Sequence, residues 1–115
     1  MAIEYPNTNL YIDGKWRPAV TGETLDVINP ATEEVIGQVA RAQHADLDEA
    51  LEAADKAFAS WKKTTPLDRY RILRKAADLL RERASMIAEV MTTEQGKPLA
   101  EAKVETLMGA DRIDW

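Results

Sequence analysis

The sequence contains no cysteine and only one histidine, His44, among its 115 residues. The lack of cysteine excludes disulfides, thiolate metal sites and a cysteine nucleophile within these residues. A lone histidine gives no ligand cluster for zinc or iron, and its polar surroundings favour a solvated loop residue over a catalytic one. No apolar run is long enough to span a bilayer, and no secretory signal begins the chain. These absences lead us to expect a cytoplasmic location.

The composition indicates one small globular domain without affinity for polyanions. Hydrophobic residues make up 45% and charged residues 30% of the chain, and the formal net charge is −5. That charge argues against general binding to nucleic acid or an anionic membrane. A basic segment contains Arg69, Arg71, Arg74, Lys75, Arg81 and Arg83, interrupted by Asp68, Asp78 and Glu82. It lacks the interleaved aromatic residues of a stacking platform, so we expect a helix surface with i,i+4 ion pairs.

Two β-hairpins are predicted between residues 10 and 40. In the first, Asp13-Gly14 separates two short β-forming segments, 10–12 and 15–17. Asp-Gly is a strong hairpin signal because a type I′ turn requires positive φ at both central residues. The second hairpin pairs residues 25–29 with 35–39 across a turn at 30–34. Two hairpins alone are marginally stable in water, so they should pack on helices or on another sheet.

Three helices are predicted over about residues 46–62, 66–95 and 98–115. Asp46 is followed three residues later by Glu49, which is the spacing of a capping box. Thr65 and Pro66 form an N-cap with proline at the first helical position. The second helix has an apolar stripe of Tyr70, Leu73, Ala77, Leu80, Ala84, Ile87 and Met91. Packing on a neighbouring helix is favoured over a coiled coil, because three of these seven residues are alanine or tyrosine.

No catalytic constellation is evident in the sequence. The carboxylate pairs are Glu33 with Glu34, in a turn, and Glu101 with Glu105, at the i,i+4 spacing of a solvated helix flank. No glycine-rich loop follows a strand, so neither a Rossmann fingerprint nor a P-loop is present. One side of the third helix carries Ala102, Thr106, Gly109 and Ile113. Small residues there would allow close approach of another backbone or leave room beside a cavity, and packing is the favoured explanation for what offsets the cost of a mid-helix glycine.

Several motifs, in order and spacing, resemble the NAD(P)-dependent aldehyde dehydrogenase family. They are LYIDGKW at 10–16, VINPAT at 27–32 followed by VIG at 35–37, the alanine-rich segment 50–61, residues 69–80, and EQGKPLAEA at 94–102. The last motif is most similar to the succinate-semialdehyde dehydrogenase branch. The resemblance implies an α/β fold in which β-hairpins and three helices form the N-terminal part of a dinucleotide-binding domain. Residues 1–115 would be that part, with the catalytic domain outside the chain.

The resemblance also implies the chemistry of the parent protein. A cysteine attacks a small aldehyde to give a thiohemiacetal, hydride passes to NAD or NADP, and water hydrolyses the thioester. The family's catalytic and cofactor-binding residues lie beyond residue 115, so this chain alone is expected to be inactive and to need the remainder of the dehydrogenase. Members commonly form homo-oligomers. Many bind a monovalent cation, and the corresponding positions here are Ile28, through its carbonyl, and Glu94, where many relatives carry aspartate.

The alternative is a non-catalytic helical module that packs on a partner chain. The apolar faces of the three predicted helices need a covering surface, and a partner could supply it. The third helix runs to Trp115 without a glycine–proline stop signal, whereas a standalone module should show one. The sequence therefore favours a piece of an enzyme over an interaction module.

Overall fold

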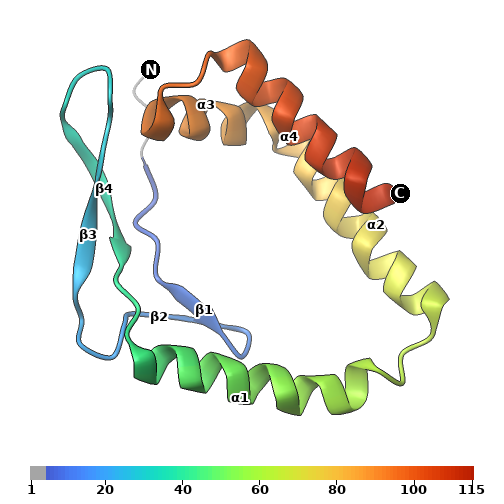
Figure 1. The fold of residues 1–115 in the computed structure, drawn as a ribbon. Coiled ribbons are helices and arrows are strands. Elements are labelled where there is room, and N and C mark those ends of the chain that lie inside the picture. Colours follow the sequence, from blue (N-terminus) through green and yellow to red (C-terminus); the bar gives the residue numbers. More distant parts are fainter. Residues whose placement is uncertain (1–4) are drawn as a thin grey trace. The chain divides into compact units, whose positions relative to one another are not determined.

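The structure, a computed structural model, describes residues 5–115. Its elements are β1 (Leu10–Ile12), β2 (Lys15–Arg17), β3 (Thr24–Ile28), β4 (Val35–Ala40), α1 (His44–Trp61), α2 (Pro66–Glu82), α3 (Ala84–Gln95) and α4 (Leu99–Asp114) (Figure 1). The chain divides into two compact units. The hairpin–α1 unit contains residues 5–27 and 35–64, and the α2–α4 unit contains residues 28–34 and 65–115. The expected order of β-hairpins followed by helices is confirmed.

Both predicted hairpins are present. Strands β1 and β2 pair antiparallel with Tyr11 opposite Trp16, and the two rings lie 5.0 Å apart between centroids. Asp13 and Gly14 have φ values of 50° and 74°, which are the positive angles that the Asp-Gly signal predicted. Strands β3 and β4 form a second two-stranded sheet. Both hairpins therefore lie where the sequence predicted them, the first because of its Asp-Gly turn.

The start of α1 differs from the prediction. The helix begins at His44 with Gln43 as its N-cap, two residues before the expected start at Asp46. The carboxylate of Asp46 accepts the backbone N–H of Gln43 at 2.9 Å, so Asp46 is the third helical residue of the capping box and Glu49 is not its partner. His44 consequently lies on the helix and not in the expected loop, although it is exposed as predicted.

The predicted single helix over 66–95 is wrong: the segment forms two helices, α2 and α3, so the chain has four helices within residues 5–115. Arg83 separates them, with φ −95° and ψ 4°. Hydrogen bonding continues on both sides, because Arg83 N–H donates to Leu79 and Arg83 O accepts from Ile87. The apolar periodicity also passes through the break, so the pattern did not reveal it. The two helices run in different directions (Figure 1).

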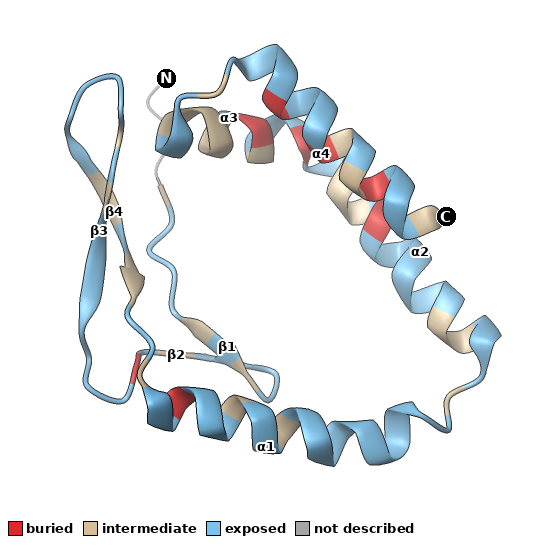
Figure 2. Ribbon diagram, viewed as in Figure 1, coloured by how far each residue is buried: buried red, intermediate tan, exposed pale blue. Residues whose placement is uncertain are grey.

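Small residues form the core of the α2–α4 unit. Helix α4 packs on both α2 and α3, and most of the buried positions in Figure 2 lie on these three helices. The fully or nearly fully buried residues of the unit are Ala77, Ala84, Ala88, Ala102, Thr106 and Ala110. The buried Thr106 hydroxyl has a hydrogen-bond partner within the helix, because it donates to the Ala102 carbonyl at 2.9 Å. Of the four residues on the predicted small-residue face of α4, Ala102 and Thr106 are buried in this packing, whereas Gly109 is half-buried and Ile113 is exposed. That helix begins at Leu99, with Pro98 as N-cap.

Candidate functional site

The predicted cation ligands lie next to two turns of the α2–α4 unit. Ile28 is the last residue of β3 and is 51% exposed, and the turn 29–34 follows it. Asn29 organises this turn: its side-chain Oδ1 accepts the Ala31 N–H at 2.9 Å, and its backbone N–H donates to the Glu34 carbonyl at 2.9 Å. The Asn29 carbonyl accepts the Glu33 N–H at 2.8 Å, where the backbone has a φ of 61°. The turn is therefore closed by its own hydrogen bonds.

The second turn joins α3 to α4. Glu94 lies in the last turn of α3 and is exposed. Gly96 caps the helix in the left-handed conformation, with φ 77°, and its N–H donates to the Thr92 carbonyl at 2.9 Å. The two turns lie against each other, because a Cβ built on Gly96 would be 3.1 Å from Pro30 Cγ. The structure thus brings together the chain segments that contain Ile28 and Glu94.

The donor set fits a monovalent cation in its chemistry. A backbone carbonyl and a carboxylate are hard oxygen donors, which suit alkali cations better than soft or imidazole-preferring metals. Within residues 5–115 no group of three or more histidine, cysteine, aspartate or glutamate side chains is placed to hold a metal ion. A divalent site made of clustered carboxylates is therefore not formed by this part of the chain. Two oxygen donors fill only part of a coordination sphere, so further ligands must come from elsewhere.

Other carboxylate and basic residues considered in the sequence form ion pairs within the α2–α4 unit. Glu105 forms an ion pair with Lys97, which ties the start of α4 to its second turn. Arg71 pairs with Asp68 at 3.1 Å, and Arg74 pairs with Asp78 at 3.4 Å. The basic segment therefore carries i,i+3 and i,i+4 ion pairs, as the sequence predicted, and its Arg74 and Arg81 also pair with Asp114 on α4.

An ion-pair cluster that the sequence did not reveal joins β2 to α1. Arg17 Nη1 donates to Asp46 Oδ1 at 2.8 Å, and Arg17 Nη2 donates to Glu49 at 2.5 Å. Asp46 is only 2% exposed and also accepts the Val20 N–H at 3.0 Å. The hydrogen bonds from the Gln43 backbone and from Arg17 lower the pKa of Asp46 from its ordinary value. The cluster fixes the hairpin to the helix, and both carboxylates are engaged in that contact.

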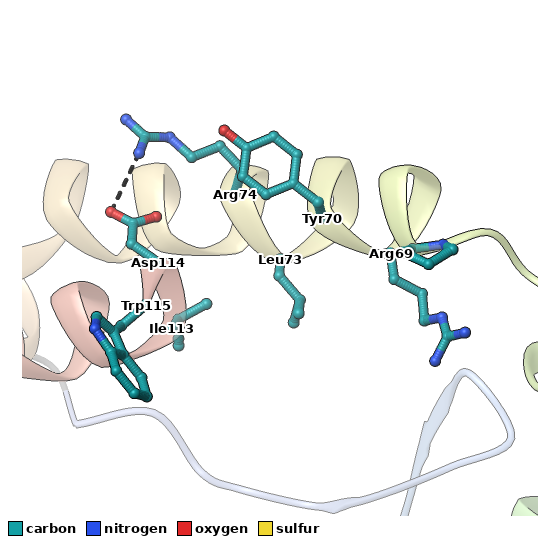
Figure 3. Close-up of a pocket in the computed structure, with 8 residues that line it drawn as sticks. Arg69, Tyr70, Leu73, Arg74, Ile113, Asp114 and Trp115 are labelled. Carbon is teal, nitrogen blue, oxygen red and sulfur yellow. Dashed lines mark ion pairs between the residues drawn. The ribbon is translucent and has the colours of Figure 1, made fainter.

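A groove runs between α2 and α4 (Figure 3). Its volume is about 360 Å³, and its lining residues are Pro66, Arg69, Tyr70, Leu73, Arg74, Ile113, Asp114 and Trp115. Arg74 spans it to Asp114 at 3.2 Å. Nearby, Arg81 binds Asp111 at 2.8 Å and Asp114 at 2.5 Å, and these two carboxylates raise the pKa of Arg81. The lining contains no cysteine, serine or histidine, and Arg74 and Asp114 form an ion pair across it.

Comparison with known proteins gives consistent matches over nearly the whole chain. Residues 16–115 match the aldehyde dehydrogenase family. A glutarate-semialdehyde dehydrogenase of Pseudomonas putida is 48% identical over 105 residues, which is 91% of this chain and 22% of that protein. An NAD-dependent aldehyde dehydrogenase from Sinorhizobium meliloti superposes with a TM-score of 0.91 at 33% identity, covering 95% of this chain and 22% of its own. An Escherichia coli NADP-dependent enzyme gives 0.93 at 38%, covering 95% and 23%.

Proposed function

This chain belongs to the aldehyde dehydrogenase family, and we propose that it is the N-terminal part of an NAD(P)-dependent dehydrogenase that oxidises a small semialdehyde to its carboxylic acid. The observation that carries the proposal is the match of sequence and fold together over residues 16–115. The chain spans about 22% of the length of the curated relatives it matches. Residues 1–115 would then be the first part of the NAD(P)-binding domain, with the catalytic domain outside them.

The chemistry of this proposal requires residues that the chain does not contain. The family's thiohemiacetal step uses a cysteine, and none occurs here. The nicotinamide, when bound, accepts the hydride. Residues 1–115 would supply the hairpins and helices of the cofactor-binding domain and no reacting group. The chain alone is therefore expected to show no turnover, and the remainder of the dehydrogenase is its first partner.

The substrate class is a semialdehyde of a short dicarboxylic acid. The segment at 94–102 resembles the succinate-semialdehyde branch, whereas the Pseudomonas putida relative is named for glutarate semialdehyde. These substrates differ by one methylene, which a pocket discriminates by about 1–3 kcal/mol, or roughly 10- to 200-fold. One similar structure is named as NAD-dependent and another as NADP-dependent, so either cofactor is proposed for the parent protein. The parent protein should therefore be assayed with both semialdehydes and both cofactors.

A monovalent cation bound through the Ile28 carbonyl and Glu94 is part of the proposal. It is supported by the donor chemistry and by the contact between the turns that contain these residues. The cation would hold the two turns together and would take no part in hydride transfer. A homo-oligomeric assembly and a cytoplasmic location are also predictions for the parent protein. The helices that the structure describes include none long and apolar enough to cross a membrane.

The second candidate function is the helical assembly module. Large apolar side chains on α1 are exposed, namely Leu47, Leu51, Phe58 and Trp61. A partner chain could cover them. The same exposure follows if the rest of the dehydrogenase covers them, and the family match favours that explanation.

The test is an assay of the full-length polypeptide that contains these residues. We expect reduction of NAD or NADP with succinate or glutarate semialdehyde, and no reduction by the isolated 115-residue chain. An intact mass several times 12.9 kDa should accompany the activity. Turnover of neither semialdehyde with either cofactor, by a folded protein of full length, would contradict the proposed substrate class. A natural polypeptide of about 12.9 kDa that binds a second protein would instead support the assembly module.

A further inference from the structure

We propose that the contact between Pro30 and Gly96 is a positioning device that sets the geometry of the monovalent cation site; this inference rests on the cation site proposed above. Each predicted ligand lies two residues before one of the two residues in contact. Ile28 lies two residues before Pro30, and Glu94 lies two residues before Gly96. A change in the distance between Pro30 and Gly96 therefore also changes the position of the Ile28 carbonyl relative to the segment that contains Glu94.

Two features of Gly96 make the contact possible. Its φ of 77° lies in the left-handed region, where L side chains are strained. Its missing Cβ also leaves the space that the proline ring approaches, since a built Cβ would be 3.1 Å from Pro30 Cγ. That separation is tighter than an ordinary carbon–carbon contact of about 3.5–4.0 Å. A side chain at position 96 would push the turn at 29–34 away by a few tenths of an ångström.

The proline side of the contact is rigid. Asn29 holds its turn through hydrogen bonds to the backbone of Ala31, Glu33 and Glu34. Proline has a fixed φ and a ring that cannot fold away. Because the turn is closed internally, it moves as a unit, and Ile28 at its start moves with it. A push at Pro30 is thus transmitted to the Ile28 carbonyl and is not absorbed by the loop.

The experiment measures cation binding by thermal stability in the full-length protein. The melting temperature is followed against potassium and, separately, sodium chloride, with choline chloride keeping the ionic strength constant. A cation that binds only the folded state raises the melting temperature in a saturable way. The half-saturating concentration is the readout, and turnover with the semialdehyde is measured in parallel.

The informative variant is Gly96→Ala, and its matched control is Gly22→Ala. Gly22 has nearly the same φ, 72°, but nothing lies within 4 Å of a Cβ built there. The control therefore reproduces the backbone strain without the collision. We expect Gly96→Ala to raise the half-saturating concentration by about 10- to 100-fold, the size of effect seen when outer-shell support of a metal site is lost. Gly22→Ala should leave it unchanged.

Pro30→Ala keeps the inference testable if Gly96→Ala does not fold. It removes the ring from the contact without changing Gly96, and we expect it to raise the half-saturating concentration in the same direction. In the double variant the alanine Cβ at position 96 occupies the space that the ring has left, so its effect should be smaller than the product of the single effects.

Three results would overturn the inference. The first is an unchanged half-saturating concentration in both Gly96→Ala and Pro30→Ala. The second is an equal rise in Gly22→Ala, which would assign the effect to general destabilisation. The third is a full-length protein that oxidises the semialdehyde but shows no potassium- or sodium-specific stabilisation. That third result removes the cation site and this inference while the dehydrogenase assignment stands, whereas absent turnover with intact cation binding removes the substrate proposal alone.

Discussion

Replacing Gly109 by alanine should stabilise the α2–α4 unit. Gly109 lies in the interior of α4, four residues after Glu105, on the side that faces α2. A mid-helix glycine costs about 0.5–1 kcal/mol relative to alanine because of its larger backbone entropy in the unfolded chain. The small-residue face of α4 suggested that packing requires this glycine. The structure shows that it does not, because a Cβ at position 109 would lie 3.6 Å from Leu80 Cδ2, an ordinary van der Waals distance.

The expected magnitude follows from that geometry. Gly109→Ala recovers about 0.5–1 kcal/mol of helix propensity and meets no steric penalty. For a denaturation slope of about 1.5 kcal/mol/M, the urea midpoint should rise by about 0.3–0.7 M. Gly109→Leu should have the opposite sign, because its longer side chain would enter the space of Leu80, and overpacking costs about 1–3 kcal/mol.

The assay is urea unfolding of the 115-residue chain and its variants, followed by far-UV circular dichroism. Gly96→Ala serves as the opposite-sign control, because its left-handed backbone and its contact with Pro30 both penalise a Cβ. The reasoning would be refuted if Gly109→Ala lowered the midpoint while the slope stayed constant. Such a result would mean that a neighbour other than Leu80 restricts position 109.

Two further predictions concern helix starts. Asp46→Asn should lower the urea midpoint at neutral pH. Hydrogen bonds from Gln43 and Arg17 hold the pKa of Asp46 below its ordinary 3.8, so its contribution to stability is fully present above that value and is lost as the pH falls through the lower folded pKa. The urea midpoints of the two proteins should therefore converge only in acid, and a difference that stays constant as the pH falls through this range would contradict the reasoning. Thr65→Ala should cost about 0.5–2 kcal/mol by removing the N-cap of α2, whereas the exposed Ser85→Ala should change little, and equal midpoints would contradict the cap.

Local signals in the sequence predicted local structure well. Asp13-Gly14 gave the first hairpin because few residues accept positive φ at both turn positions. Thr65-Pro66 marked the start of α2, where the threonine hydroxyl accepts the Asp68 N–H at 3.2 Å. The predicted end of the helix at residue 95 coincides with the end of α3, which Gly96 caps in the left-handed conformation. Each signal works because the decisive interaction lies within four residues of the residue that reveals it.

The errors came from interactions that local patterns do not encode. Asp46, the predicted start of the first helix, is instead the third helical residue of a capping box with Gln43, and its other partner Arg17 lies far away along the chain. The break at Arg83 is a change of backbone angle within an uninterrupted apolar pattern, so neither propensity nor periodicity marks it. The contact of Pro30 with Gly96 joins two turns that the sequence identified separately. For the candidate cation site, the family resemblance pointed to Ile28 and Glu94, and the fold shows contact between the turns next to them.

Helix α4 carries apolar residues on more than one face. One face of the helix is buried against α2 and α3 through Ala102, Thr106 and Ala110, while Val104 and Met108 are about half exposed on another. A helix with apolar residues on more than one face is typical of helices covered from both sides. A catalytic domain of the same polypeptide and a separate partner chain would satisfy this requirement equally. The proposed dehydrogenase function therefore rests on the family match over residues 16–115, which a helix-packing surface alone does not require.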